Sequence, residues 1–245
     1  MILEVVGSGS KGNCYILHND NEALMLEAGV PFKSVLSVLG GKIELLEGCL
    51  VTHEHKDHSG YVKDLLDHAV RVYATEGTCQ AMVPWSKSKI GVPMAIRSKM
   101  LKIGNFLIIP FETVHDAEQP CGFFIRHPEM GNLLFATDTH YLPNTFKDIS
   151  NVMIECNYDE VLLAERKDIP ETLKERIRGS HMSVETCIEA LAANDLSKVN
   201  NIVLIHISEG DGDPESFKEK VRNATGKTVH VAEAGLSIDF NITPF

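Results

Sequence analysis

Short apolar segments that end in polar or ionisable residues recur along the chain, and they constrain its fold more than any other feature. Their positions are 48–58 (GCLVTHEHKDH), 106–116 (FLIIPFETVHD), 132–140 (NLLFATDTH), 151–157 (NVMIECN) and 201–208 (NIVLIHIS). Apolar runs of four to eight residues are typical of buried strands. The pattern therefore predicts a sheet-based fold with chemically active residues at the strand ends.

Helical patterns lie between some of these segments. Residues 61–70 and 183–195 place apolar residues at helical spacing, and Ser183 is a suitable N-cap with Glu185 nearby. Strands dominate the first half and strand–helix alternation the second, which predicts packed sheets with helices outside. Residues 228–240 are interpreted as a terminal pair of strands around Gly235.

The bulk composition predicts a soluble protein with one domain over residues 1–245. Hydrophobic residues make up 44% and charged residues 23% of the chain, and no run approaches the roughly 20 apolar residues of a membrane span. The N-terminus has no basic start, and the six cysteines are scattered singly. We therefore expect a cytoplasmic, disulfide-free protein without a membrane partner. The net charge of −11 discourages loose binding to polyanions, although a local basic patch or a bound metal overrides a global sign.

The glycine-rich segment GSGSKGN, residues 7–13, matches G-x-G-x-x-G, and Glu27 follows at the spacing of the acidic residue in a dinucleotide site. Such a site needs a helix whose N-terminus faces the pyrophosphate. Here CYILH (14–18), the turn-like NDNE and ALMLE (23–27) follow instead, a pattern that predicts a hairpin. We therefore expect no nucleotide cofactor and interpret the glycines as a tight hairpin loop.

The segment THEHKDH concentrates four metal-competent side chains in six residues: His53, His55, Asp57 and His58. In an extended run, residues two apart point the same way, so the first two histidines can address one metal. Asp57 and His58, where the chain turns toward the next helix, can address a second. The alternative is a solvated polar loop, but this density of ligands favours a metal site.

The H-x-H-x-D-H pattern of this loop resembles the metallo-β-lactamase superfamily, and the resemblance runs through nearly the whole chain. It implies an α+β fold, a four-layer αβ/βα sandwich of two mixed β-sheets flanked by helices. It also implies two divalent cations, Zn²⁺ or Mn²⁺. The implied ligands are His53, His55, His115 and Asp138 for one cation, and Asp57, His58, Asp138 and His206 for the other. Spacing by itself establishes only the first cluster, from His53 to His58.

The order of the motifs is similar to that of the bacterial YycJ (WalJ) group of nuclease-like proteins. Glu155 in IECN and His181 in SHMS also resemble a glutamate and histidine that ribonuclease Z sets beside its metals. A histidine oriented by a carboxylate can contact a phosphate oxygen or protonate a leaving alkoxide. The family usually has aspartate at the position of Glu27, which we expect to support the histidine loop.

These resemblances imply a dinuclear metal-dependent hydrolase of phosphodiesters, a DNA exonuclease or related nuclease that uses a metal-bound hydroxide. Asp57 is expected to orient the hydroxide, and His181 with Glu155 to assist the leaving group. Ser10, Lys11 and Asn13 of the glycine loop are expected to touch a substrate phosphate. DNA is favoured over RNA, because the long arm with which ribonuclease Z clamps transfer RNA is missing.

Two alternatives remain open for the function. One is a small-molecule hydrolase of the same fold that acts on a thioester, lactone or cyclic nucleotide, which the net acidity favours. The other is a non-catalytic binding protein, although none of the expected ligand positions is missing.

Two basic stretches have two possible interpretations each. The first contains Trp85, Lys87, Lys89, Arg97, Lys99 and Lys102, and the second contains Arg166, Lys167, Lys174, Arg176 and Arg178. Either stretch contacts nucleic-acid phosphates or is a solvated surface.

Overall fold

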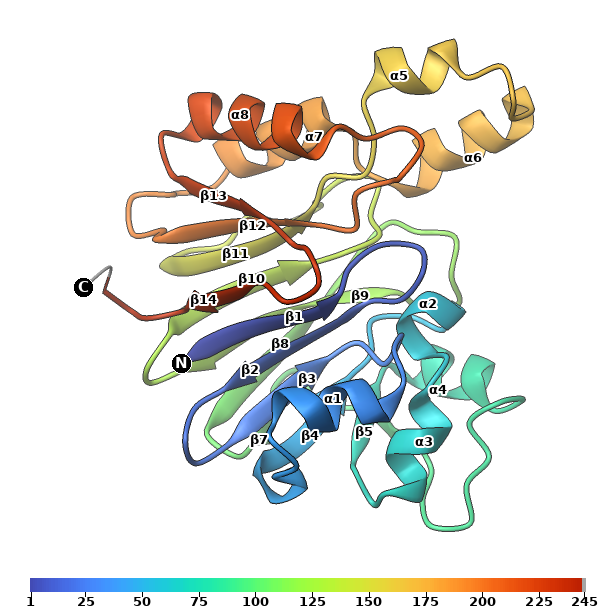
Figure 1. The fold of residues 1–245 in the computed structure, drawn as a ribbon, viewed down its shortest axis with the longest axis vertical. Helices are drawn as coiled ribbons and strands as arrows, with labels where there is room; N and C mark the ends of the chain where they lie inside the picture. Colours follow the sequence, from blue (N-terminus) through green and yellow to red (C-terminus); the bar gives the residue numbers. More distant parts are fainter. Residues whose placement is uncertain (244–245) are drawn as a thin grey trace.

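The computed structural model describes residues 1–243, which form two seven-stranded β-sheets (Figure 1). The first sheet runs, in spatial order, β14 (Ser237–Asp239), β1 (Ile2–Gly7), β2 (Cys14–His18), β3 (Ala23–Leu26), β4 (Leu46–Leu50), β5 (Val72–Ala74) and β6 (Met94–Ala95). The second runs β13 (Thr228–Val231), β12 (Asn201–Ile205), β11 (Ile149–Glu155), β10 (Gly131–Ala136), β9 (Cys121–His127), β8 (Phe106–Glu112) and β7 (Leu101–Ile103).

Helices cover the outer faces of both sheets. The helices of the described chain are α1 (Phe32–Val38), α2 (Lys56–Ser59), α3 (Val62–Asp67), α4 (Glu76–Met82), α5 (Glu160–Glu165), α6 (Glu171–Ser180), α7 (Val184–Ala192) and α8 (Pro214–Thr225), with a 3₁₀ turn at Ile43–Leu45. Figure 1 shows α1, α3 and α4 against the first sheet, α7 and α8 against the second, and α5 and α6 at the same end as α2. The predicted sandwich of two mixed sheets flanked by helices is confirmed.

Three apolar layers hold the sandwich together. The central layer lies between the sheets and includes the fully buried Leu24, Phe106 and Phe135. One outer layer packs α1, α3 and α4 on the first sheet, and the other packs α7 and α8 on the second. Each buried leucine or phenylalanine contributes about 1.5–3 kcal/mol, so these layers are the main source of stability.

Parallel pairing brings many strand ends to one edge of the molecule. Strands β3 to β6 are parallel neighbours in the first sheet, and β10 to β13 are parallel neighbours in the second. Strand β8 runs in the direction of β10, because both are antiparallel to β9. The carboxyl ends of β3, β4, β8, β10, β11 and β12 therefore point to one edge, where open α/β sheets bind their ligands.

Local sequence explains several element boundaries. Every residue of β11 is buried, as expected for a central parallel strand. The predicted N-cap Ser183 is confirmed, because its side chain accepts a hydrogen bond from the backbone N of Thr186 at the start of α7. Helix α8 begins with Asp213 as N-cap and ends at Gly226, which has a left-handed φ of 66°.

Two sequence-based expectations were wrong in detail. The terminal strands around Gly235 exist, but β13 pairs with β12 in the second sheet, whereas β14 pairs with β1 in the first. The first half is also less strand-dominated than predicted, because α1, α3 and α4 alternate with the parallel strands β3 to β6. Local patterns identify a strand, but its partner depends on which distant edge is free.

Among residues 1–243, every helix is too short or too polar to span a lipid bilayer. All six cysteines are free thiols.

Candidate metal centre

Three residues with left-handed backbone conformations stand just after strands of the two sheets. Glu27 follows β3, Asp138 lies two residues after β10, and His206 follows β12, with φ of 66°, 44° and 54°. Such conformations cost non-glycine residues about 1–3 kcal/mol and concentrate at functional sites. The strained turns direct all three side chains into the region between the strand ends.

The histidine loop contributes the first group of side chains. His53 and His55 lie on the loop between β4 and α2, not on an extended strand as predicted, yet their ring centroids are 4.7 Å apart. His53 Nδ1 is 2.9 Å from Thr52 Oγ1, which fixes the ring. His53 Nε2 is buried and has no hydrogen-bond partner among the described residues. It is therefore available as a ligand atom.

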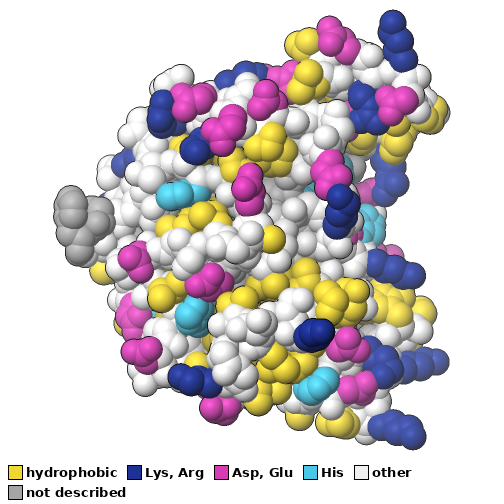
Figure 2. All heavy atoms as spheres, in the orientation of Figure 1, with side chains coloured by type: hydrophobic (Ala, Val, Ile, Leu, Met, Phe, Trp, Pro, Cys, Tyr) yellow, Lys and Arg dark blue, Asp and Glu magenta, His cyan; other side chains and the backbone are white. Residues whose placement is uncertain are grey.

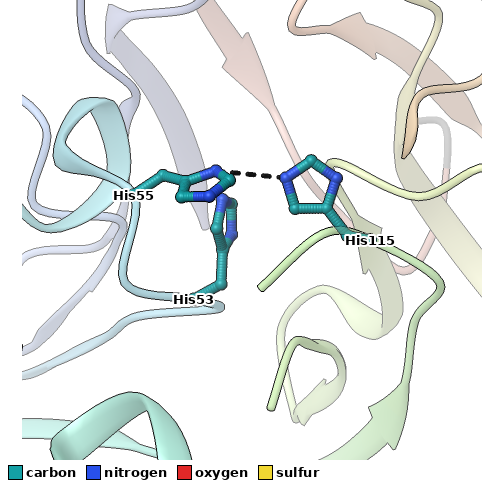
Figure 3. Close-up of side chains that lie close together, drawn as sticks. All are labelled: His53, His55 and His115. Carbon is teal, nitrogen blue, oxygen red and sulfur yellow. Dashed lines mark hydrogen bonds between the residues drawn. The ribbon is translucent and has the colours of Figure 1, made fainter. Parts of the chain in front are cut away.

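His115, from the loop after β8, faces these two rings (Figure 3). Its Nδ1–H donates to the carbonyl oxygen of Ser180 at 2.7 Å. Its Nε2 is 3.2 Å from His55 Nδ1. The bond to Ser180 orients the ring and leaves Nε2 with a free electron pair, as in many metal-binding histidines. Nitrogen atoms of His53, His55 and His115 lie close enough together to hold one ion.

A second group forms around α2 and the end of β12. His58 Nε2 is 3.2 Å from Asp57 Oδ2 and 3.3 Å from Asp138 Oδ1. His206 Nε2 is 3.3 Å from Asp57 Oδ2, and its Nδ1 is 3.4 Å from Asp138 Oδ1. These four side chains form a second set with the geometry of an ion site.

The buried Asp138 carboxylate lies between the two groups. Its Oδ2 is 3.8 Å from His53 Nε2 and 3.7 Å from His115 Nε2, whereas its Oδ1 faces His58 and His206. Each oxygen therefore belongs to a different group. The carboxylate therefore lies within reach of both groups.

Burial and opposite charge set the protonation of the centre. Burial lowers the pKa of His53 and His115, which keeps their rings neutral. Burial works against ionisation of Asp138, but His206 and His58 hold its pKa well below the ordinary value. Burial likewise opposes the charged form of His206, but Asp138 raises the pKa of His206 to about 10. The carboxylates of the second group are therefore ionised and stabilise positive charge on the groups beside them.

Glu27 lies behind the histidine loop, where the sequence placed it. Its Oε2 is 3.5 Å from His58 Nδ1 and accepts a hydrogen bond from the backbone N of Thr52 at 3.4 Å. The residue is fully buried, and burial raises its pKa while His58 opposes the rise. Glu27 thus contacts both ends of the His53–His58 loop.

His181 and Glu155 form a hydrogen-bonded pair beside the two groups. His181 Nδ1–H donates to Glu155 Oε1 at 2.6 Å. Glu155 Oε2 accepts from the backbone N of Thr139 at 2.9 Å and of Met182 at 3.1 Å. The His181 ring stacks on His206, with a centroid distance of 5.5 Å. Its side chain is 19% exposed, so it is the imidazole of this pair that solvent or a ligand reaches.

Of the three glycine-loop residues predicted to touch a substrate phosphate, Asn13 lies at the centre and the other two do not. Asn13 is buried, and its Nδ2 is 3.1 Å from His58 Nε2 and 3.3 Å from Asp57 Oδ2. Ser10 and Lys11 are exposed, and Lys11 Nζ pairs with Glu209 Oε1 at 2.6 Å instead of facing the centre. A role of Ser10, Lys11 or Asn13 toward a substrate stays a prediction.

The glycines allow backbones to approach closely beneath the centre. The predicted hairpin is confirmed, since β2 pairs antiparallel with β1 and β3. A Cβ atom on Gly29 would lie 1.7 Å from the carbonyl oxygen of Asp57, and one on Gly12 would lie 2.2 Å from that of Gly29. Asn13 N donates to the same Asp57 oxygen at 2.7 Å. The glycine loop therefore serves as a support for α2.

Sequence reasoning missed two residues that hold His206. Ser8 Oγ accepts from His206 N at 3.0 Å, and Asn157 Nδ2 donates to His206 O at 2.8 Å. Both stand inside motifs that were noted for other reasons. Nothing local links Ser8 to a residue 198 positions away.

Comparisons with known proteins identify the family and the fold. A profile of the Beta-lactamase superfamily domain matches residues 33–207. Exodeoxyribonuclease WalJ of Streptococcus pneumoniae serotype 2 is 27% identical over 254 aligned positions, covering 97% of this chain and 91% of WalJ. Exodeoxyribonuclease YycJ of Bacillus anthracis is 28% identical over 255 positions, covering 97% and 92%. The metallo-β-lactamase fold protein YhfI of Bacillus subtilis superposes with a TM-score of 0.70 at 16% identity, covering 97% of this chain and 99% of YhfI.

The similarity inferred from the motifs, both to the superfamily and to the YycJ/WalJ group, is thus confirmed. Because the profile covers well over half of the residues, this chain belongs to the β-lactamase superfamily and has the metallo-β-lactamase fold.

Proposed function

We propose that this chain is a metal-dependent phosphodiesterase that degrades DNA from an end. The relatives named exodeoxyribonuclease support the choice of DNA over RNA. The observation that carries the proposal is the His181–Glu155 pair, hydrogen-bonded at 2.6 Å beside the shared Asp138. An acid placed next to a two-cation centre suits cleavage of a phosphodiester, whose leaving alkoxide needs a proton.

The donor atoms fit two divalent cations. The first would be held by His53, His55 and His115, with Asp138 Oδ2 nearby, and the second by Asp57, His58, Asp138 and His206. The buried His53 Nε2 has no hydrogen-bond partner in residues 1–243, so its electron pair is free to coordinate a cation. Imidazole and carboxylate ligands suit Zn²⁺ and also Mn²⁺. When bound, such a pair lowers the pKa of coordinated water and neutralises charge on a phosphodiester.

The side chains of this chain divide the remaining work. Asp57 Oδ2, between His58 and His206, is positioned to orient the attacking water. Glu155 fixes the Nδ1 side of His181, so that the other nitrogen holds the transferable proton. Burial works against protonation of His181, but the Glu155 carboxylate raises its pKa, which favours the protonated ring. The roles are those of a water-orienting base and a general acid.

We also propose a cytoplasmic location and a single folding unit over residues 1–245. Six free thiols suit a reducing compartment. The pairing of β1 with β14 ties the two ends of the described chain into one sheet.

A substrate panel tests the proposed function. The purified chain is loaded with Zn²⁺ or Mn²⁺, its metals are counted by mass spectrometry, and it is given end-labelled single- and double-stranded DNA, matched RNA, bis(p-nitrophenyl) phosphate and a glutathione thioester. We expect about two metals per chain and stepwise release of nucleotides from DNA. Thioester turnover without phosphodiester cleavage would contradict the proposal.

A further inference from the structure

Residues 77–111 carry an unusual charge for this acidic protein. The segment contains no Asp or Glu, although the whole chain has a net charge of −11. Its exposed cations include Lys87, Lys89, Arg97 and Lys99. Together with Lys56 of α2, these four residues are called the basic strip below. Figure 2 shows Lys and Arg side chains gathered along the edge of the molecule beside the region of α2 to α4.

Most charges of the basic strip are unpaired. Within residues 1–243, Lys87, Lys89 and Lys99 have no carboxylate within 4 Å, and Arg97 lies 3.5 Å from Glu76. The second basic stretch of the sequence differs, because its arginines are neutralised by nearby acids. The pairs are Arg166 with Asp168 and Asp211, Arg176 with Asp116, and Arg178 with Glu160 and Glu171. In the second stretch only Lys167 has no carboxylate partner among the described residues, so most of the free positive charge lies in the first stretch.

The basic strip borders a cleft and exposed apolar side chains. A cavity of about 560 Å³ between α4 and residues 86–97 has a lining that includes Lys87, Ser88 and Arg97, together with Glu76, the partner of Arg97. This volume lies within the usual range of small-ligand sites, roughly 300–1,000 Å³. Ile90 and Val92 next to it are 61% and 72% exposed. Free cations alternating with apolar surface are what single-stranded nucleic acids bind, because phosphates need charge and unstacked bases need apolar contact.

The basic strip is continuous with the metal centre. Lys56 directly precedes Asp57 on α2, and its Nζ lies 6.0 Å from the ring centroid of Trp85. Trp85 is half-buried and packs against the apolar layer of α3 and α4, so it anchors the start of segment 86–97. A strand that leaves the centre past Lys56 therefore meets the cleft next.

We propose that the basic strip is a track for the single-stranded part of the nucleic-acid substrate, and that the cleft between α4 and residues 86–97 receives one of its nucleotides. The inference rests on the proposed function, which it deepens by naming single-stranded DNA as the form that is bound. Charge complementarity and the position beside the centre favour a substrate strand over an anionic lipid surface.

A triple variant, Lys87→Gln with Lys89→Gln and Lys99→Gln, tests the track. Its matched control, Lys147→Gln with Lys218→Gln and Lys227→Gln, removes the same charge from exposed or partly exposed positions outside the basic strip. The measurements are turnover of bis(p-nitrophenyl) phosphate, KM for a 20-nucleotide single strand, and Kd for that strand by fluorescence anisotropy at several salt concentrations.

We expect the triple variant to hydrolyse the small phosphodiester within about twofold of wild type, while KM and Kd for the single strand rise at least tenfold. The slope of log K against log salt should become shallower by about 2, since each charge on a single strand contributes roughly 0.7. The control should match wild type in all three measurements.

The outcomes separate this inference from the proposed function. Wild-type affinity in the triple variant, or an equal loss in the control, would overturn the track without contradicting the hydrolysis of phosphodiesters. A different result is that the wild-type chain cleaves no phosphodiester but binds the single strand, and that the triple variant loses this binding. That result would support the basic strip as a binding surface and contradict the proposed nuclease activity.

Discussion

Three imidazoles of the centre are oriented through their Nδ1 atoms. His53 is fixed by the Thr52 hydroxyl, His115 by the Ser180 carbonyl and His181 by the Glu155 carboxylate. The first two partners are neutral, whereas the third is a carboxylate. A carboxylate partner favours the protonated imidazole, which supports the proposed acid role of His181.

Replacing His181 with alanine should separate chemistry from metal binding. We expect metal content to stay at the wild-type value while phosphodiester turnover falls by about a hundredfold or more, the usual scale for a general acid. Turnover with bis(p-nitrophenyl) phosphate and metal counts by mass spectrometry measure the two effects. His68→Ala, at the exposed C-terminal end of α3, is the control. Unchanged turnover in the His181 variant would remove this residue from the mechanism.

Removing the shared carboxylate should affect both cation sites. In Asp138→Ala we expect fewer than one metal per chain, whereas His206→Ala, which alters only the second group, should keep about one. Asp148→Ala is a suitable control, since Asp148 also has a left-handed φ, of 56°, but lies outside both groups. Metal counts after gel filtration, with circular dichroism to verify folding, decide the matter. Two metals bound to the Asp138 variant would refute its bridging role.

Among the structural elements, the short helix α2 depends on the glycine loop packed beneath it. Backbone hydrogen bonds join Asn13 N to Asp57 O at 2.7 Å and Ala28 N to His58 O at 2.6 Å. Side chains at Gly12 and Gly29 would occupy the same space. The glycine pattern that resembles a nucleotide fingerprint is thus explained by contact between three backbone segments.

Gly29→Ala should accordingly destabilise the protein by at least about 2 kcal/mol, because its Cβ would meet backbone and not a movable side chain. Gly179→Ala is the matched control. Gly179 lies in α6 with nothing within 4 Å of its added Cβ, so the substitution should stabilise the helix by up to about 1 kcal/mol. Urea unfolding measures both. Equal free energies of unfolding for the two variants would show that the backbone around Gly29 can move to accept a Cβ atom without loss of stability.

For the molecule as a whole, the centre is a cluster of buried ionisable side chains at the edge where the strand ends of the two sheets meet. Four ionisable side chains are buried there: Asp138, Glu155, His58 and His206. Without cations, the two carboxylates are neutralised by the neighbouring histidines. Cations that bind only the folded chain must stabilise it by mass action. The free energy of unfolding of the whole chain should therefore depend on the cations bound at the centre.

Metal at about 100 times its Kd should stabilise the folded chain by about 2.7 kcal/mol relative to chelator-treated protein. For a chain of this size that corresponds to a Tm increase of roughly 5–11 °C, measurable by differential scanning calorimetry. The Asp138→Ala variant should show little or no increase. A wild-type Tm that ignores added Zn²⁺ and Mn²⁺ would contradict the two-cation centre.

Sequence by itself determined the features that depend on neighbours along the chain. The His53–His58 cluster needs only six adjacent residues, Ser183 caps a helix that begins at the next residue, and buried strands are recognisable from short apolar runs. Tertiary structure alone decided which strand ends meet. His53, Asp138 and His206 converge because β4, β10 and β12 end at one edge of two sheets, and β13 and β14 separate because each fills a different free edge. Strand pairing over such distances is set by the burial of whole faces, which no local pattern encodes.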